Sequence, residues 1–353
     1  MNTELVDKEG NPISVPGFNG HQVMINGLAT FYVEGPRNGP PLLLISGVNE
    51  VWQNYIPVLD ALSRHHHIYL CDLRGHGKTG WSEDRKYRVI DYAQDAEQFI
   101  ETVIGEPCNV AGHSLGALIA VKLASSANAL VKSVSLEDPP ILITEWAVFG
   151  KDSFWMRHIF KAMLDAVAES REKEWSLEEL TERLHNTIPF RVNPNPEQPE
   201  RRIIGLAKML QKLRDFNALP PPGSEAYERF TKGCIKLLGG ELTTLSEMEA
   251  PKFIAKTIAT DFVHMDLATL EGALAPTFSE GFNQRDALAN IHRPTLIFWS
   301  DPDIIGFLND QGRADVKSLV PGPVEEVIVE NAGHHVHADA TDLFIEKLNA
   351  HFS

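Results

Sequence analysis

The feature that most constrains this chain is the motif GHSLG at residues 112–116, which lies between two apolar runs of different character. The run Cys108–Ala111 before it is typical of a buried strand, and the run Ala117–Ala124 after it is typical of a buried helix. The small residues that flank Ser114 allow a tight reversal, which strains the serine backbone and presents its hydroxyl at a helix N-terminus. A developing oxyanion is favoured there. The motif therefore predicts that Ser114 is a nucleophile.

Short apolar runs alternate with helical patterns along most of the chain. The segments His21–Ile25 and Leu28–Val33 flank Asn26-Gly27, a dipeptide typical of a two-residue hairpin turn. Further strands are expected at residues 41–45, 67–71, 108–111, 131–136, 294–299 and 324–329. Strands that alternate with helices predict a parallel sheet covered on both faces. We therefore expect an α/β fold with a mostly parallel eight-stranded sheet flanked by helices.

The alternation stops between Pro139 and Asn290, where helical patterns dominate. Ser176–Glu179 is a capping box followed by leucines at helical spacing, and Arg202–Leu213 is a second helical pattern. We expect an all-helical cap, residues 139–290, inserted into a core made of residues 1–138 and 291–353. A cap of this size favours an enclosed, largely apolar cavity. The sequence assigns no substrate-binding residue within it.

A nucleophilic serine needs a base and a group that orients the base. His334 follows the last expected strand directly and is the predicted base. Two carboxylates are candidates for the orienting acid, because Asp138 follows the sixth strand and Asp303 follows the seventh. Both lie at the carboxyl ends of strands, where parallel sheets carry their chemistry. The residues alone leave both candidates open.

The oxyanion that forms during acyl transfer needs backbone N–H donors. One is expected from Leu115, the residue after the nucleophile. The other is expected from the loop Ser46–Asn49 after the third strand, where we assign it to Val48.

Charge and composition exclude several classes of function. The formal net charge of −16 argues against nucleic acid and against anionic membrane surfaces as partners.

The first residues lack a signal-peptide pattern and no apolar stretch reaches about 18 residues, so we expect a cytoplasmic protein. Three distant cysteines fit neither disulfides nor a zinc site, and no metal or cofactor is expected. The expected state is a monomer or a homodimer with a small-molecule substrate.

The chain resembles the α/β-hydrolase family with a helical cap, over nearly everything outside the cap. Besides the serine motif, the loop Asp72–Thr79 is similar to the DxRGHGxS stretch of many members, which implies a structural role for His76. Many members place the acid at the position of Asp303. A subset that resembles this chain instead has an EDPP-like stretch as in Glu137–Pro140, and a GDPxxG-like stretch as in residues 300–305. Some mycotoxin lactonases of the family are also similar in placing the acid after the sixth strand. This resemblance favours Asp138 over Asp303.

The resemblance implies acyl transfer to water through an acyl-enzyme on Ser114. The expected substrate is a carboxylic ester or lactone of a moderately bulky, largely apolar small molecule. A serine at this position argues against haloalkane dehalogenase and epoxide hydrolase chemistry, which uses a carboxylate nucleophile there. An amidase or carbon–carbon bond hydrolase with the same triad stays open, as do a cofactor-free lyase or dioxygenase that uses His334 as its base, a ligand-binding receptor and a scaffold protein.

Overall fold

The computed structural model describes residues 2–126, 129–151, 154–190, 200–304 and 307–353. Of the GDPxxG-like stretch, Ile305 lies outside the described residues. One nine-stranded sheet runs in the order β1-β2-β3-β5-β4-β6-β7-β10-β11. These strands are β1 (Asn2–Thr3), β2 (Asn19–Ile25), β3 (Leu28–Glu34), β4 (Pro41–Ile45), β5 (His67–Cys71), β6 (Cys108–His113), β7 (Val131–Glu137), β10 (Thr295–Trp299) and β11 (Val324–Ile328).

The sheet confirms the mostly parallel arrangement. Strands β5, β4, β6, β7, β10 and β11 pair in parallel, while β1, β2 and β3 join the edge in antiparallel pairs. The predicted hairpin turn is present, with positive φ angles of 47° at Asn26 and 81° at Gly27. Eight strands match those expected, and the ninth, β1, was not predicted because two residues carry no alternation.

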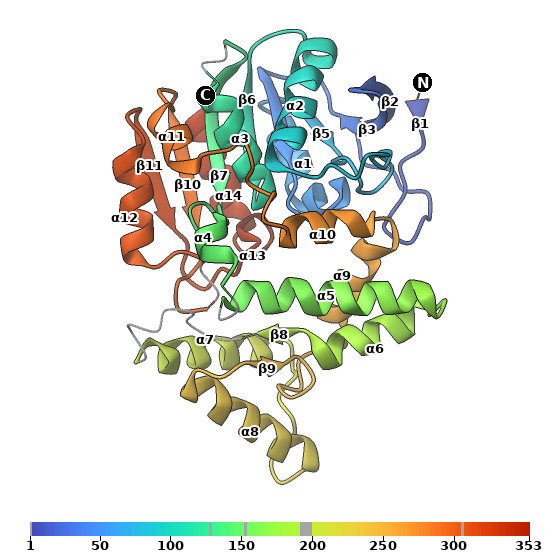
Figure 1. The fold of residues 1–353 in the computed structure, drawn as a ribbon, viewed down its shortest axis with the longest axis vertical. Helices are drawn as coiled ribbons and strands as arrows, with labels where there is room; N and C mark the ends of the chain where they lie inside the picture. Colours follow the sequence, from blue (N-terminus) through green and yellow to red (C-terminus); the bar gives the residue numbers. More distant parts are fainter. Residues whose placement is uncertain (1, 127–128, 152–153, 191–199, 305–306) are drawn as a thin grey trace.

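Helices cover both faces of the sheet (Figure 1). Strand β4 shows why, since Leu42 and Leu44 join one core cluster and Leu43 and Ile45 join the other. The first cluster includes α1 (Ile56–Ser63) and α14 (Thr341–Phe352), with α13 (Val336–Asp339) beside them. The second includes α2 (Val89–Phe99), α3 (Leu115–Ser125), α11 (Gln284–Ala289) and α12 (Asp310–Leu319). Two short turns of helix, η1 (Trp52–Tyr55) and η2 (Ile100–Ile104), complete these layers.

The chain between β7 and α11 contributes a second group of helices, of which α5 to α9 lie below the sheet in Figure 1. They are α4 (Trp146–Phe149), α5 (Trp155–Glu172), α6 (Leu177–Thr187), α7 (Arg201–Asp215), α8 (Glu225–Gly239), α9 (Lys252–Val263) and α10 (Leu267–Leu274). The predicted capping box is present, because Ser176 accepts from the Glu179 N–H and Glu179 accepts from the Ser176 N–H.

Two strands of two residues, β8 (Pro189–Phe190) and β9 (Thr243–Thr244), pair among these helices, where the sequence predicted helix only. Leu288 on α11 lies within the range expected for the cap, and it packs in the core cluster of the sheet. The cap boundaries at 139 and 290 stay a prediction. No helix in the described ranges is long and apolar enough to cross a membrane.

Candidate active site

Ser114 lies in a sharp turn between β6 and α3. Its backbone has φ 53° and ψ −114°, a conformation that side chains rarely adopt. The two glycines of the motif are required by space. A Cβ on Gly112 would lie 2.1 Å from the Gly116 carbonyl oxygen, and a Cβ on Gly116 would lie 2.1 Å from the Ile45 carbonyl oxygen. The strain at Ser114 is therefore held by close packing of the turn against β4.

His334 and Asp138 meet at the carboxyl ends of the strands. The Nδ1 atom of His334 lies 2.7 Å from Oδ2 of Asp138, which is 1% exposed. The other oxygen of Asp138 accepts hydrogen bonds from the Ser300 hydroxyl at 2.8 Å and from the Ser300 N–H at 3.3 Å. Both oxygens of the Asp138 carboxylate thus have partners, which fixes its position and orients the imidazole of His334.

Asp303, the alternative acid, has different partners. Its Oδ1 lies 2.5 Å from Nε of Arg201, and its Oδ2 lies 3.5 Å from Nζ of Lys208. Both cations are on α7. The neighbouring Asp301 also pairs with Lys208, at 2.6 Å. The two aspartates after β10 therefore join the sheet to α7, whereas Asp138 contacts His334.

The protonation state of His334 suits a base. Burial lowers the pKa of His334 from 6.5 to about 4, and the nearby His113 adds to this, while Asp138 opposes it. The centroid of the Phe307 ring lies 4.3 Å from that of the imidazole, in an edge-to-face contact. His334 is therefore neutral at pH 7 and able to accept a proton.

The loop after β4 has two N–H groups that are already bonded, on either side of Val48. The Gly47 N–H donates to Oε2 of Glu50 at 2.6 Å, and the Asn49 N–H donates to Nε2 of His76 at 3.1 Å. Among the described residues, neither Val48 N–H nor Leu115 N–H has an acceptor, and both residues line the same cavity as Ser114. The two N–H groups are thus available to bind an anionic oxygen.

His76 fixes this loop by accepting the hydrogen bond from the Asn49 N–H. Its Nδ1 donates to the Arg74 carbonyl at 2.8 Å, so Nε2 is left to accept from Asn49. Burial lowers the pKa of His76 to about 4, which keeps Nε2 unprotonated at neutral pH. This arrangement fits the structural role that the resemblance implied.

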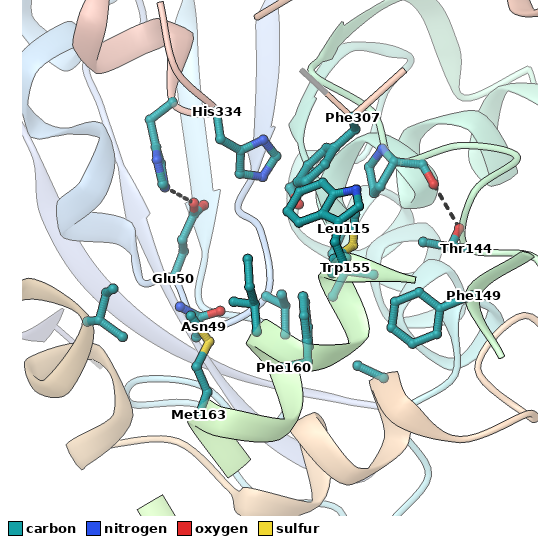
Figure 2. Close-up of a pocket in the computed structure, with 18 of the residues that line it drawn as sticks. Asn49, Glu50, Leu115, Thr144, Phe149, Trp155, Phe160, Met163, Phe307 and His334 are labelled. Atoms are coloured by element: carbon teal, nitrogen blue, oxygen red, sulfur yellow. Dashed lines mark hydrogen bonds and ion pairs between the residues drawn. The ribbon is translucent and has the colours of Figure 1, made fainter. Parts of the chain in front are cut away.

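Ser114, His334, Val48 and Leu115 border one cavity of about 400 Å³. Figure 2 shows Glu50 and His334 on the left of the cavity, Phe149 of α4 on the right, and Trp155 of α5 between them. The rest of the wall is largely apolar, and α5 contributes more residues to it than any other helix. The larger apolar residues of the whole wall are Phe149, Trp155, Met156, Phe160, Met163 and Phe307. Such a wall suits a small molecule with an apolar body.

A cluster of two buried residues and one exposed histidine, which the sequence analysis missed, lies beside the loop. Oε1 of Glu50 is 2.8 Å from Nδ1 of His113 and 2.8 Å from Nε2 of His335. In the described part of the chain, these three residues form the one group whose ligand atoms, within 4.8 Å of one another, can hold a metal ion. They lie far apart in the sequence, so no ligand spacing reveals them.

Comparison with known proteins places this arrangement in a family. A family model described as "alpha/beta hydrolase fold" matches residues 40–341. The chain is 30% identical over 137 residues to "Putative carbamate hydrolase RutD" of Variovorax paradoxus (strain S110), a match that covers 38% of this chain and 49% of that protein. It is 32% identical over 116 residues to "(E)-2-((N-methylformamido)methylene)succinate hydrolase" of Acinetobacter baylyi (strain ATCC 33305 / BD413 / ADP1), over 33% of this chain and 43% of that protein.

Each match thus spans less than half of the curated relative. Among solved structures, the Cif epoxide hydrolase from Acinetobacter nosocomialis superposes with a TM-score of 0.59 at 16% identity, over 97% of this chain and 91% of that one. This likeness concerns the fold. Because the family model covers most of the chain, from β4 to the start of α14, the protein belongs to the alpha/beta hydrolase fold family.

Proposed function

We propose that the protein is a serine hydrolase that cleaves a carboxylic ester or lactone of a small, largely apolar molecule. The observation that carries this proposal is that a strained serine and a histidine already paired with a buried carboxylate border one apolar cavity. Three groups with the roles of nucleophile, base and orienting acid are the requirement for this chemistry.

In the proposed reaction, the Ser114 hydroxyl attacks the substrate carbonyl carbon while Nε2 of His334 takes its proton. Asp138 holds Nδ1–H and stabilises the imidazolium that forms. The N–H groups of Val48 and Leu115 bind the oxyanion of the tetrahedral intermediate. His334 then returns the proton to the leaving alkoxide, which departs as an alcohol or, from a lactone, stays on the acyl chain. Water attacks the acyl-enzyme by the same route and frees Ser114.

The test is hydrolysis of a panel of p-nitrophenyl esters and aromatic lactones by the wild type and three variants. Ser114→Ala and Asp138→Asn are expected to lose activity by roughly 10⁴-fold, the order found when a triad member is removed. Asp303→Asn is the matched control, because it also changes a buried aspartate at the end of a strand. Activity that survives Ser114→Ala refutes the acyl-enzyme and favours a base-only reaction at His334.

An amide or carbamate is the second candidate for the bond that is cleaved. The curated relatives are described as a carbamate hydrolase and a formamido-compound hydrolase, and the same triad serves those bonds. Adding p-nitroanilides and p-nitrophenyl carbamates to the panel separates the two. A kcat/KM for these compounds above that for matched esters would assign the protein to the second candidate.

The cytoplasmic location and the monomeric or homodimeric state stay predictions. So do the small-molecule partner and the role of residues 139–290 as a separate cap.

A further inference from the structure

Three side chains beside the proposed catalytic residues take no part in the proposed acyl transfer. Glu50 is 3% exposed and His113 is fully buried, while the side chain of His335 is 47% exposed. Oε1 of Glu50 lies 2.8 Å from Nδ1 of His113 and 2.8 Å from Nε2 of His335. These atoms come from the loop after β4, the end of β6 and the loop after β11. Their meeting at one point needs an explanation other than the proposed reaction.

The bonding of His113 directs a lone pair toward this point. Its Nε2 lies 2.9 Å from the carbonyl oxygen of His334, which only accepts hydrogen bonds, so Nε2 carries a hydrogen and Nδ1 of the neutral ring carries a lone pair. Nδ1 is buried and makes no hydrogen bond with the described residues, although Oε1 of Glu50 is near enough for one. Histidines that bind metals commonly donate one ring N–H to a carbonyl and present the other nitrogen in this way.

The space beside the two buried ligands is kept open by a glycine. A Cβ on Gly47 would lie 3.1 Å from the carboxyl carbon of Glu50 and 3.1 Å from Nδ1 of His113. The Gly47 N–H donates to Oε2 of Glu50 at 2.6 Å, which leaves Oε1 for the two histidines. Within the described ranges, the ion pairs of this buried carboxylate are with those histidines and not with a lysine or arginine. A cation held between the three ligand atoms would compensate the buried charge.

We propose that Glu50, His113 and His335 bind one zinc ion at the wall of the cavity. Two imidazole nitrogens and one carboxylate oxygen are a donor set typical of zinc, whereas magnesium and calcium prefer oxygen ligands. Glu50 and His335 both line the cavity, so the fourth coordination position faces it and takes a water molecule or an oxygen atom of a bound compound. The site uses no residue assigned to acyl transfer, and the inference therefore stands apart from the proposed function.

The three ligand atoms need a small adjustment to hold the ion. Zinc bonds of about 2.0–2.2 Å place neighbouring ligand atoms about 3.0–3.4 Å apart. The two separations of 2.8 Å must therefore widen by about 0.2–0.6 Å. His335 can supply this movement, because its side chain is partly exposed and lines the cavity.

The first measurement is zinc binding by the full chain without a histidine tag. The protein is stripped with EDTA and dialysed against Zn²⁺ buffered by a competing chelator, and its metal content is then measured by mass spectrometry. The wild type is expected to bind one zinc per chain. His335→Ala is expected to bind zinc at least about 100-fold more weakly, since the loss of even an outer partner of a ligand costs about 10- to 100-fold in affinity.

His264→Ala is the matched control, because it removes an exposed histidine outside the group and should bind zinc like the wild type. Glu50→Gln tests a second ligand and is expected to weaken binding as His335→Ala does, with circular dichroism to check that it is folded. X-ray absorption at the zinc edge is expected to show two imidazole rings in the wild type and one in His335→Ala at saturating zinc.

Two results would overturn the inference. One is a wild type that binds no zinc at micromolar free Zn²⁺, as expected if Glu50 and the histidines are only ion-paired. The other is zinc that binds equally to the wild type and His335→Ala, which places the ion elsewhere. The proposed function is judged separately by ester hydrolysis, because Ser114→Ala leaves all three ligands in place and should still bind zinc.

Discussion

Replacing Gly116 by alanine tests the packing that strains Ser114, the proposed nucleophile. The new Cβ would lie 2.1 Å from the Ile45 carbonyl oxygen and 2.8 Å from that of Ser46, whereas Cβ atoms essentially never approach other atoms closer than 3.0 Å. The start of α3 and the end of β4 must therefore separate by about 0.9 Å. Leu115 lies on one side of this contact and the loop with Val48 on the other. The separation moves the two oxyanion donors apart by a similar distance.

A displacement of this size costs about one oxyanion hydrogen bond, which lowers kcat by roughly 10²- to 10³-fold. Overpacking is expected to lower the free energy of unfolding by about 1–3 kcal/mol as well. The assay is kcat with a p-nitrophenyl ester, alongside Tm from calorimetry. Gly80→Ala is the matched control, because its Cβ has no neighbour closer than 3.6 Å, and it should retain kcat. A folded Gly116→Ala variant with kcat within about threefold of wild type would refute this reasoning.

Three further predictions address the base, the link to α7 and the cavity wall. The kcat/KM of the wild type should fall with decreasing pH only through an apparent pKa of about 4, that of His334, and a profile that falls near pH 6.5 would contradict the low pKa. Lys208→Met should destabilise the fold by about 1–3 kcal/mol at pH 7, because it leaves the buried Asp301 carboxylate with less compensation. Since Lys208 helps to lower the pKa of Asp301, this loss should be complete above about pH 4 and shrink as the pH falls, and thermal unfolding at pH 7 and pH 3 checks both the size and the sign. Trp155→Ala should lower the free energy of unfolding by about 3–5 kcal/mol and shift the preferred ester toward larger acyl groups, and an unchanged chain-length profile would exclude Trp155 from substrate selection.

The sheet was predictable because its central strands are apolar on both faces. A run such as that of β4 has no stable place except between two layers of helices, and the Asn26-Gly27 turn specifies the hairpin at the edge. The strands β1, β8 and β9 were not predictable. Each has two residues, so its pairing depends on what the rest of the fold places beside it.

The placement of the candidate site residues was predictable where their position in the sequence determines their position in the fold. Ser114 and His334 each follow a strand or its loop, and the carboxyl ends of parallel strands share one edge. The same rule left Asp138 and Asp303 equivalent, since β7 and β10 are neighbours in the sheet. Their partners differ only through contacts across the fold, with His334 in one case and α7 in the other.

The pair Glu50–His113 was hidden for a related reason. His113 stands inside the serine motif and is read as part of it, and Glu50 lies 63 positions earlier in the chain. A single glutamate or a single histidine in the sequence does not by itself predict a buried charge. The ion pair arises because β4 and β6 are adjacent and parallel, which brings the loop after one strand beside the end of the other.

Helix α5 contributes to the cavity wall, whereas the strand ends carry the groups proposed to react. This separation affects how the range of bound compounds can change by mutation. The groups proposed to react are fixed by backbone at the ends of β6, β7 and β11, while one helix supplies Trp155, Phe160 and Met163 to the wall. Side chains on that helix can be exchanged without moving a strand. Substitutions on one face of α5 can therefore change which compounds bind, while the positions of the groups proposed to react stay the same.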